Sequence, residues 1–156
     1  MSSFDLRIRA AAADDLAAIV AFNIALARES EDITLDPTTV YDGVWAGLAD
    51  PGRGLYFLAE ENGRVIGQTM VTLEWSDWRN GFFWWIQSVY VEPACRRRGV
   101  FRRLYQHIRA LARERDDVCG LRLYVYDKNV NAIKTYRILG MKQTDYLLCE
   151  EDWSRP

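Results

Sequence analysis

An apolar segment that runs directly into an arginine-rich loop and then a helix constrains this chain more than any other feature. Residues 82–91 are apolar and aromatic, with Gln87 and Ser88 as interruptions in the second half. Such a run predicts a central strand that is covered on both faces. Glu92-Pro93 ends the strand, and an amphipathic helix is predicted from about residue 99 to residue 115. A strand, a basic loop and a helix in this order predict an α/β protein.

The loop of residues 96–99, Arg-Arg-Arg-Gly, has the composition of an anion-binding site. The amide groups at a helix start and the helix dipole favour a negative charge. Gly99 permits close approach of the backbone, and arginines donate paired hydrogen bonds to phosphate oxygens. The loop lacks the Gly-Lys-Ser/Thr of a P-loop and the three glycines of a dinucleotide fingerprint. It therefore predicts a pyrophosphate cradle, with a solvated basic helix start as the alternative.

The remaining sequence predicts short strands and helices within one mixed α/β domain that spans residues 1–156. A helix is expected from about Asp14. Another is expected from Asp36-Pro37, which combines a good N-cap with a residue suited to the first helical position. Asn62-Gly63 is typical of a hairpin turn. The other expected elements are strands at residues 6–10, 55–60, 65–75, 121–126 and 144–151, and a turn and short helix at residues 127–139, closed by Gly140.

Composition and charge exclude several classes of function. The chain has 156 residues, 49% hydrophobic and 27% charged, with a formal net charge of −2, so it lacks the positive charge that attracts nucleic acid. No apolar run approaches the ~20 residues that span a bilayer, and the first residues do not resemble a signal peptide. The three cysteines and the single histidine lack metal-ligand spacing. We expect a cytoplasmic protein with free thiols that binds no metal, membrane or nucleic acid.

Two segments carry a resemblance to a known family. Arg96 and Gly99 are in register with the Arg/Gln-x-x-Gly-x-Gly/Ala motif of the GCN5-related N-acetyltransferases, although Phe101 stands where that family usually has Gly or Ala. Residues 127–141 are similar to the family's Asn-x-x-Ala-x-x-x-Tyr-x-x-x-Gly-Phe segment, with Met141 in place of Phe. The matching positions of the second segment are Asn129, Ala132, Tyr136 and Gly140. The Asp77-Trp78 loop and the tyrosine-rich end are distantly similar to the spermidine/spermine acetyltransferase branch.

The resemblance implies a fold, a co-substrate and a reaction. The expected fold is a mixed, mostly antiparallel twisted sheet flanked by about four helices. The expected co-substrate is acetyl-CoA, and the acetyl group moves to a primary amine by direct attack on the thioester, without a metal. The residues that would contact acetyl-CoA are Val89, Tyr90, Val91, Arg96, Arg97, Arg98, Gly99, Val100, Phe101, Arg102, Asn129, Asn131 and Tyr136.

Direct transfer makes three chemical demands. The backbone N–H of Val89, or of a neighbour on a splayed central strand, would stabilise the oxyanion. Tyr136 would protonate the departing thiolate. The base is less well defined, since Gln87 stands where many relatives carry a catalytic Glu. Glu74, with Asp77 behind it, is the nearest acid that could act through water, and the alternative is that both are solvated strand-end acids.

The acceptor is expected to be a small-molecule amine. The acids between the first two helices and the nearby tryptophans predict either an acidic, aromatic pocket for a cation or a charged loop over an aromatic core. These residues are Glu29, Glu31, Asp32, Asp36, Trp75, Trp78, Trp84 and Trp85. Two other functions stay open, namely a coenzyme A-binding sensor without turnover and a protein lysine or N-terminal acetyltransferase. A homodimer is also left open.

Overall fold

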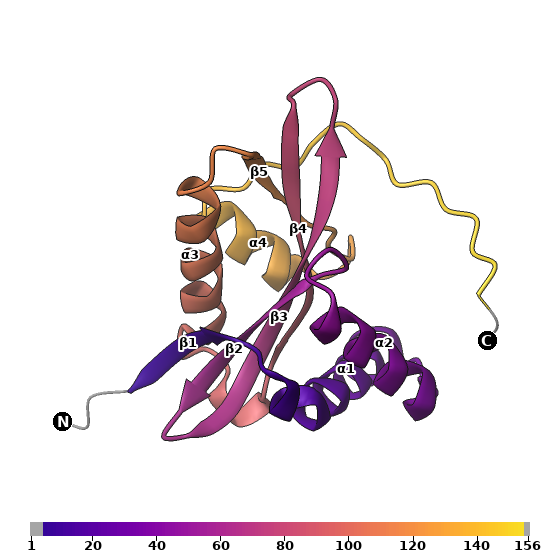
Figure 1. Cartoon of the computed structure of the whole chain (residues 1–156), viewed down its shortest axis with the longest axis vertical. Helices are drawn as coiled ribbons and strands as arrows, with labels where there is room; N and C mark the ends of the chain where they lie inside the picture. Colours follow the sequence, from indigo (N-terminus) through magenta and orange to yellow (C-terminus); the bar gives the residue numbers. More distant parts are fainter. Residues whose placement is uncertain (1–4, 155–156) are drawn as a thin grey trace. The chain divides into compact units, whose positions relative to one another are not determined.

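The computed structural model describes residues 5–154, whose contacts group into one compact unit up to Tyr124 and a second from Val125 onward. Whether the chain is one domain therefore stays a prediction. Among the described residues, the first unit contains the sheet and three α-helices, and the second contains one α-helix (Figure 1). The elements are β1 (Leu6–Ala10), α1 (Leu16–Glu31), α2 (Pro37–Ala49), β2 (Leu55–Glu61), β3 (Arg64–Ser76), β4 (Gly81–Val91), α3 (Val100–Arg113), β5 (Val118–Arg122) and α4 (Val130–Ile138).

The sheet has the order β1-β2-β3-β4-β5. The first three pairings are antiparallel, and β5 lies parallel to β4. The connection from β4 to β5 contains α3, as a parallel pair requires. The predicted fold class, a mixed and mostly antiparallel sheet with about four helices, is confirmed.

The alternation of side chains along the strands divides the buried residues between the two faces of the sheet. Leu58 packs with α1 and α2, whereas its neighbour Ala59 packs with α3. Figure 1 shows α1 and α2 together, with α3 apart from them across the strands. The α3 face contains Phe57, Ala59, Ile66, Val71, Trp84, Cys95, Val100, Leu104, Ile108 and Ala112. The α1–α2 face contains Leu16, Ile19, Val44, Tyr56 and Leu58.

The boundaries that local chemistry determines were predicted well. Asp36 caps α2, because its Oδ2 accepts a hydrogen bond from the Thr39 amide at 2.8 Å. Asn62 and Gly63 turn the β2–β3 hairpin with φ angles of +52° and +76°, the left-handed conformation that this residue pair favours. The helix expected from Asp14 begins as a 3-10 turn at Ala13–Asp15 and continues as α1.

The predicted strand at residues 121–126 was misplaced, because β5 begins at Val118 and ends at Arg122. Gly120 resembles a strand breaker in the sequence, but it lies inside the strand opposite Phe83. A Cβ atom at residue 120 would lie 2.7 Å from Cε1 of Phe83, so the bulky ring requires glycine there. The start is fixed by the Asp117 carbonyl, which accepts the Phe82 amide at 2.7 Å.

The strand predicted at residues 144–151 was wrong. No residue from Val125 to Ser154 is assigned to a strand. The apolar side chains that produce the strand pattern are exposed, with Tyr146 at 80%, Leu147 at 91% and Leu148 at 70% of their full accessible area. Strand propensity reflects packing on a pleated, half-buried surface, so the pattern alone does not produce a strand.

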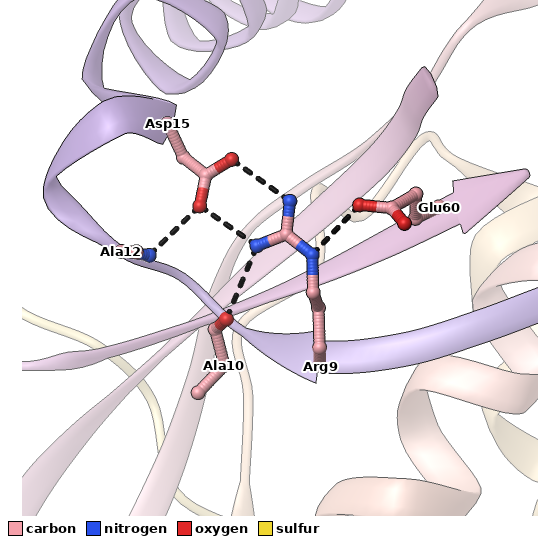
Figure 2. A network of polar contacts seen from close by, with 5 residues as sticks. All are labelled: Arg9, Ala10, Ala12, Asp15 and Glu60. Atoms are coloured by element: carbon pink, nitrogen blue, oxygen red, sulfur yellow. Dashed lines mark hydrogen bonds and ion pairs between the residues drawn. The ribbon is translucent and has the colours of Figure 1, made fainter. Parts of the chain in front are cut away.

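Arg9 on β1 joins the sheet to the start of the first helical segment (Figure 2). Its Nη1 and Nη2 donate to the Asp15 carboxylate at 2.8 and 2.9 Å, and its Nε donates to Glu60 on β2 at 2.8 Å. Asp15 also accepts the Ala12 amide at 2.7 Å. The hydrogen bonds from Arg9 hold the pKa of Asp15 below its usual value, against the opposing effect of burial. This network ties β1, β2 and the entry to α1 together.

We expect Asp15→Asn to lower the free energy of unfolding by about 1–3 kcal/mol at pH 7, as for a lost hydrogen bond to a charged group. Because the folded pKa of Asp15 is lowered, its contribution is complete above the unfolded pKa of about 3.9 and is lost as the pH falls through the folded pKa. Urea unfolding at pH 7 and pH 3 measures both effects. The difference from wild type should shrink at pH 3.

Asp14→Asn is the matched control, since Asp14 is exposed and adjacent. It should change stability by less than about 0.5 kcal/mol. Equal losses for the two variants, or a difference for Asp15→Asn that does not depend on pH, would contradict the assignment.

Candidate functional site

The central strand β4 contains a bulge at the position where the sequence predicted an oxyanion donor. Gln68 of β3 pairs with Tyr90 and Met70 pairs with Gln87, so Ser88 and Val89 both lie opposite one β3 residue. Ser88 has a φ of +52°, the left-handed region that is rare for residues other than glycine. A bulge bends the strand and redirects its backbone groups. The Val89 amide therefore lies at an irregular point of β4.

Before this bulge, after Trp85, β4 loses one of its two neighbours. β5 pairs with β4 only from Phe82 to Trp85, so among the described residues β3 is the one strand that pairs with β4 past that point. Residues 89–91, which the sequence placed against acetyl-CoA, thus lie on the part of β4 that does not pair with β5. An extended ligand could hydrogen-bond to such an unpaired strand edge.

Two buried side chains of β3 hold the bulge. Thr69 Oγ1 donates to the Gln87 carbonyl at 3.1 Å, and Gln68 Nε2 donates to the Ser88 carbonyl at 3.2 Å. Both residues are 0% exposed. Sequence reasoning missed them, although two adjacent polar residues in the middle of a predicted strand are a signal that could have identified them.

The loop after β4 leads into α3 through two residues with left-handed backbone. Arg97 has a φ of +59° and Gly99 a φ of +79°. The Arg103 amide donates to the Gly99 carbonyl at 3.0 Å, which is the first turn of α3. The amides of the preceding turn face the loop, as at any helix start, and favour an anion. The predicted cradle therefore lies at the start of a helix, and whether it binds an anion stays a prediction.

The side chain of Arg96 is braced within the protein. Its Nε donates to the Val91 carbonyl at 2.8 Å, its Nη2 forms an ion pair with Glu29 of α1, and its guanidinium lies 5.5 Å above the Tyr90 ring. Tyr90 also donates to Glu29 at 3.3 Å. Burial raises the pKa of Tyr90, and the charge of Glu29 adds to this effect. Arg96 thus connects the loop to β4 and α1.

The other predicted arginines divide into two groups. Arg98 forms an ion pair with Glu61 at the end of β2, with a distance of 2.6 Å. Arg97 and Arg102 are exposed. The loop backbone is therefore anchored by Arg96 and Arg98, while Arg97 and Arg102 extend toward solvent.

Glu74, the predicted base, lies in a row of polar and aromatic side chains on β3, β4 and β5. Its Oε2 accepts the Trp85 indole N–H at 2.6 Å, and its Oε1 accepts Arg122 Nη1 at 2.7 Å. Arg122 in turn lies 3.6 Å above the Phe83 ring. An ionised carboxylate has about four acceptor positions, so Glu74 keeps capacity for water.

Gln87 occupies the same strand as Trp85, two residues along. Its Nε2 donates to Thr72 Oγ1, and Thr72 lies opposite Trp85 in the β3–β4 ladder. Gln87 and Glu74 therefore lie near one another on the sheet, and each forms a side-chain hydrogen bond to the adjacent strand.

The predicted acceptor residues do not form one pocket. Glu29 pairs with Arg96 and Asp36 caps α2, so these two acids have separate partners. Trp84 is buried against α3, on the opposite face from the Glu74 partner Trp85. Trp75 is 53% exposed and Trp78 is 87% exposed. Trp84 is therefore a core residue, which agrees with the alternative of an aromatic core better than with an acceptor pocket.

The second unit contains the other motif. Asn129 caps α4, since its Oδ1 accepts the Ala132 amide at 3.1 Å, while Asn131 is exposed. Gly140 follows the helix with a φ of +95°, the conformation of a helix C-cap. Tyr136 is half-buried, and burial raises the pKa of its phenol. The phenol is therefore protonated at neutral pH, as it would be without this shift. Whether Tyr136 approaches the bulge stays a prediction.

Residues 5–154 include all three cysteines of the chain. Cys95, Cys119 and Cys149 are free thiols. In the described part of the chain, no group of three or more His, Cys, Asp or Glu side chains could hold a metal ion. None of the helices described is both long and apolar enough to cross a membrane.

Comparison with known proteins identifies a family and similar structures. The model of the acetyltransferase (GNAT) family matches residues 21–141. A possible acetyltransferase from Clostridium difficile 630 is 42% identical over 96% of this chain and 99% of that chain, with a TM-score of 0.90. A search of curated proteins finds no match.

Two further solved structures are more distant and show the fold alone. A probable acetyltransferase is 23% identical over 94% of this chain and 99% of that chain, with a TM-score of 0.81. A predicted acetyltransferase from Clostridium acetobutylicum, solved with acetyl-CoA, is 20% identical over 94% of this chain and 96% of that chain, with a TM-score of 0.75.

Proposed function

We propose that this chain, which belongs to the acetyltransferase (GNAT) family, moves the acetyl group of acetyl-CoA to a primary amine by direct attack of the amine on the thioester. As a member of this family it is an acyltransferase that uses acetyl-CoA. The observation that supports the proposed mechanism is the bulge at Ser88 and Val89, followed by the basic loop and the start of α3. These features would put an oxyanion donor and a pyrophosphate site in sequence along one segment.

The residues present suit coenzyme A. A Cβ atom at Gly99 would meet nothing within 4 Å, so the loop is open where its backbone turns into α3. We infer that the loop and helix-start amides bind the pyrophosphate, with the exposed Arg97 and Arg102 adding charge. The splayed residues 89–91 would hydrogen-bond to the extended pantetheine arm.

Three groups of this chain would serve the transfer. The Val89 amide would donate to the carbonyl oxygen of the thioester as negative charge develops there. The phenol of Tyr136, which is protonated at neutral pH, would give its proton to the departing thiolate sulfur. Glu74 would accept the amine proton through water. The new C–N bond forms as the C–S bond breaks, so the products are an acetamide and coenzyme A.

A sensor that binds acetyl-CoA without turnover is the second candidate, and Gln87 favours it. This residue cannot accept a proton, and both oxygens of Glu74 already accept hydrogen bonds from Trp85 and Arg122. A protein acceptor, such as a lysine or an N-terminus, is the third candidate. The three candidates differ in whether acetyl-CoA is consumed and in which acceptor receives the acetyl group.

Turnover with a panel of acceptors separates the three. Thiol release from acetyl-CoA is followed with small amines, polyamines and peptides, together with a mass measurement of each product. Acetylation of free amines supports the proposal, and acetylation of peptides alone supports a protein acceptor. Binding of acetyl-CoA without thiol release for any acceptor supports the sensor. Absence of both binding and turnover at millimolar acetyl-CoA would exclude all three.

At a concentration of 100 times Kd, acetyl-CoA should stabilise the folded wild type by about 2.7 kcal/mol. Its Tm should therefore rise. We expect Gly99→Ala to weaken acetyl-CoA binding at least about tenfold. The reason is that the left-handed φ of +79° disfavours a side chain, so the loop backbone would shift. Thermal shift against acetyl-CoA concentration measures both the stability and the affinity.

Gly63→Ala is the matched control, because Gly63 has a φ of +76° and equal open space around its Cβ position. Both variants should lose about 1–2 kcal/mol of stability from backbone strain. Only Gly99→Ala should lose affinity. Parallel losses of affinity would mean that the loop around Gly99 has no particular role in binding.

Tyr136→Phe preserves the ring and removes the acidic proton. We expect kcat to fall about 100-fold or more, with the Kd for acetyl-CoA near that of wild type, because general acid catalysis is lost while packing is kept. Tyr146→Phe in the same unit is the control, since Tyr146 is 80% exposed. An unchanged kcat for Tyr136→Phe, under conditions where chemistry is rate-limiting, would leave Tyr136 as a packing residue.

Glu74→Gln should lower kcat/KM and move the ascending limb of its pH profile upward, toward the amine pKa of about 10.4. The reason is that an enzyme without a base reacts only with the fraction of amine that is already neutral in solution. Asp77→Asn, three residues along on the exposed connection, should have a smaller effect. The measurement is kcat/KM against pH for wild type and both variants. Superimposable profiles would mean that solvent alone takes the proton.

A further inference from the structure

Gln68 is a polar side chain in the interior of the sheet, 0% exposed, at the position opposite Tyr90 on β4. Its amide nitrogen has two partners, Asn23 Oδ1 of α1 at 2.7 Å and the Ser88 carbonyl at 3.2 Å. Its Oε1 is buried and accepts no hydrogen bond from the residues that the structure describes. An apolar side chain of the same volume would avoid the desolvation of this oxygen, so the polar group at this position requires an explanation.

The bond to Ser88 has a directional consequence for the bulge. The Ser88 carbonyl and the Val89 amide belong to the same peptide unit. In a planar trans peptide the C=O and N–H bonds point in opposite directions, and the described residues contain no cis peptide bond. When Gln68 holds the Ser88 oxygen, it therefore aims the Val89 N–H away from itself.

Asn23 completes this arrangement from α1. The Gln68 amide has two N–H groups, and Asn23 and Ser88 take one each. Rotation of the Gln68 side chain would break both bonds together. The α1 helix thereby fixes the orientation of Gln68, and Gln68 fixes the orientation of the Ser88-Val89 peptide.

Thr69 acts on the neighbouring peptide. It holds the Gln87 carbonyl, which shares its peptide unit with the Ser88 amide. The peptide units on both sides of Ser88 are therefore fixed by side chains, at a point where the bulge interrupts the regular β3–β4 ladder.

We propose that Gln68 and Asn23 are positioning residues that orient the Val89 N–H toward the reacting carbonyl. The inference deepens the proposed function and rests on it, since it assigns a cause to the direction of the predicted oxyanion donor. Neither side chain needs to touch acetyl-CoA or the amine. Their effect passes through the backbone of β4.

Two variants separate positioning from simple stability. Gln68→Met keeps the volume of the side chain and removes both N–H donors. We expect kcat to fall about 10- to 100-fold, because a displaced Val89 N–H stabilises the oxyanion of the transition state less well. The Kd for coenzyme A, which has no thioester carbonyl, should stay within about twofold of wild type by the same reasoning.

Asn23→Leu combined with Gln68→Met removes both members of the hydrogen-bonded pair. Replacing both partners by apolar groups leaves fewer unpaired polar atoms, so the Tm of the double variant should lie above that of Gln68→Met. The kcat should stay low, since nothing then holds the Ser88 carbonyl. Asp15→Asn controls for stability, because its network lies at Arg9 and it should lower the Tm without lowering kcat.

A crystal structure of Gln68→Met gives a readout that does not depend on turnover. We expect the Ser88-Val89 peptide to rotate from its wild-type orientation. An unrotated peptide would overturn the inference, whether or not the wild type acetylates any amine. Recovery of kcat together with Tm in the double variant would also overturn it, because the pair would then be purely structural. An inactive wild type with a rotated peptide in Gln68→Met would reject the proposed function and leave the positioning intact.

Discussion

The bulge at Ser88 and Val89 is the constraint on which the rest of this structure depends. Up to Trp85, β4 pairs with both β3 and β5, and from Ile86 through the bulge to Val91 the described strand that pairs with it is β3. The strand therefore changes from a buried element of the sheet to an element with an available edge over a few residues. The regular ladder cannot satisfy the carbonyls at such a point, so buried side chains do so. Gln68 and Thr69 are polar for this reason, although both are fully buried.

The α1 helix contacts both the bulge of β4 and the basic loop that follows it. Asn23 reaches the bulge through Gln68, and Glu29, farther along the helix, contacts Tyr90 and Arg96. The first contact is largely buried, whereas Arg96 and Glu29 are about 40% exposed, at 43% and 41%. An exposed ion pair contributes at most about 1 kcal/mol and is screened by salt. The buried contact therefore determines the geometry, and the exposed ion pair can yield when an anion approaches the loop.

The sequence predicted the features that depend on neighbouring residues. Asp36 caps α2 and Asn62-Gly63 turns a hairpin through bonds and backbone angles within a few residues. The roles of Gln68 and Arg96 depend on partners 45 and 67 residues away in the chain, which no local pattern reveals. The strand predicted at residues 144–151 failed for a related reason, because a strand also requires a partner.

The contacts of Glu74 limit how it can serve as a base. Its carboxylate balances the charge of Arg122, which lies over Phe83. A proton that stayed on Glu74 would leave the Arg122 guanidinium without its counter-charge, although partial exposure of both groups softens this effect. We therefore expect Glu74 to pass the proton of the amine to water rather than to hold it. The Arg122 ion pair would then be restored before the next turnover, and the carboxylate could act as a base only where it remains open to solvent.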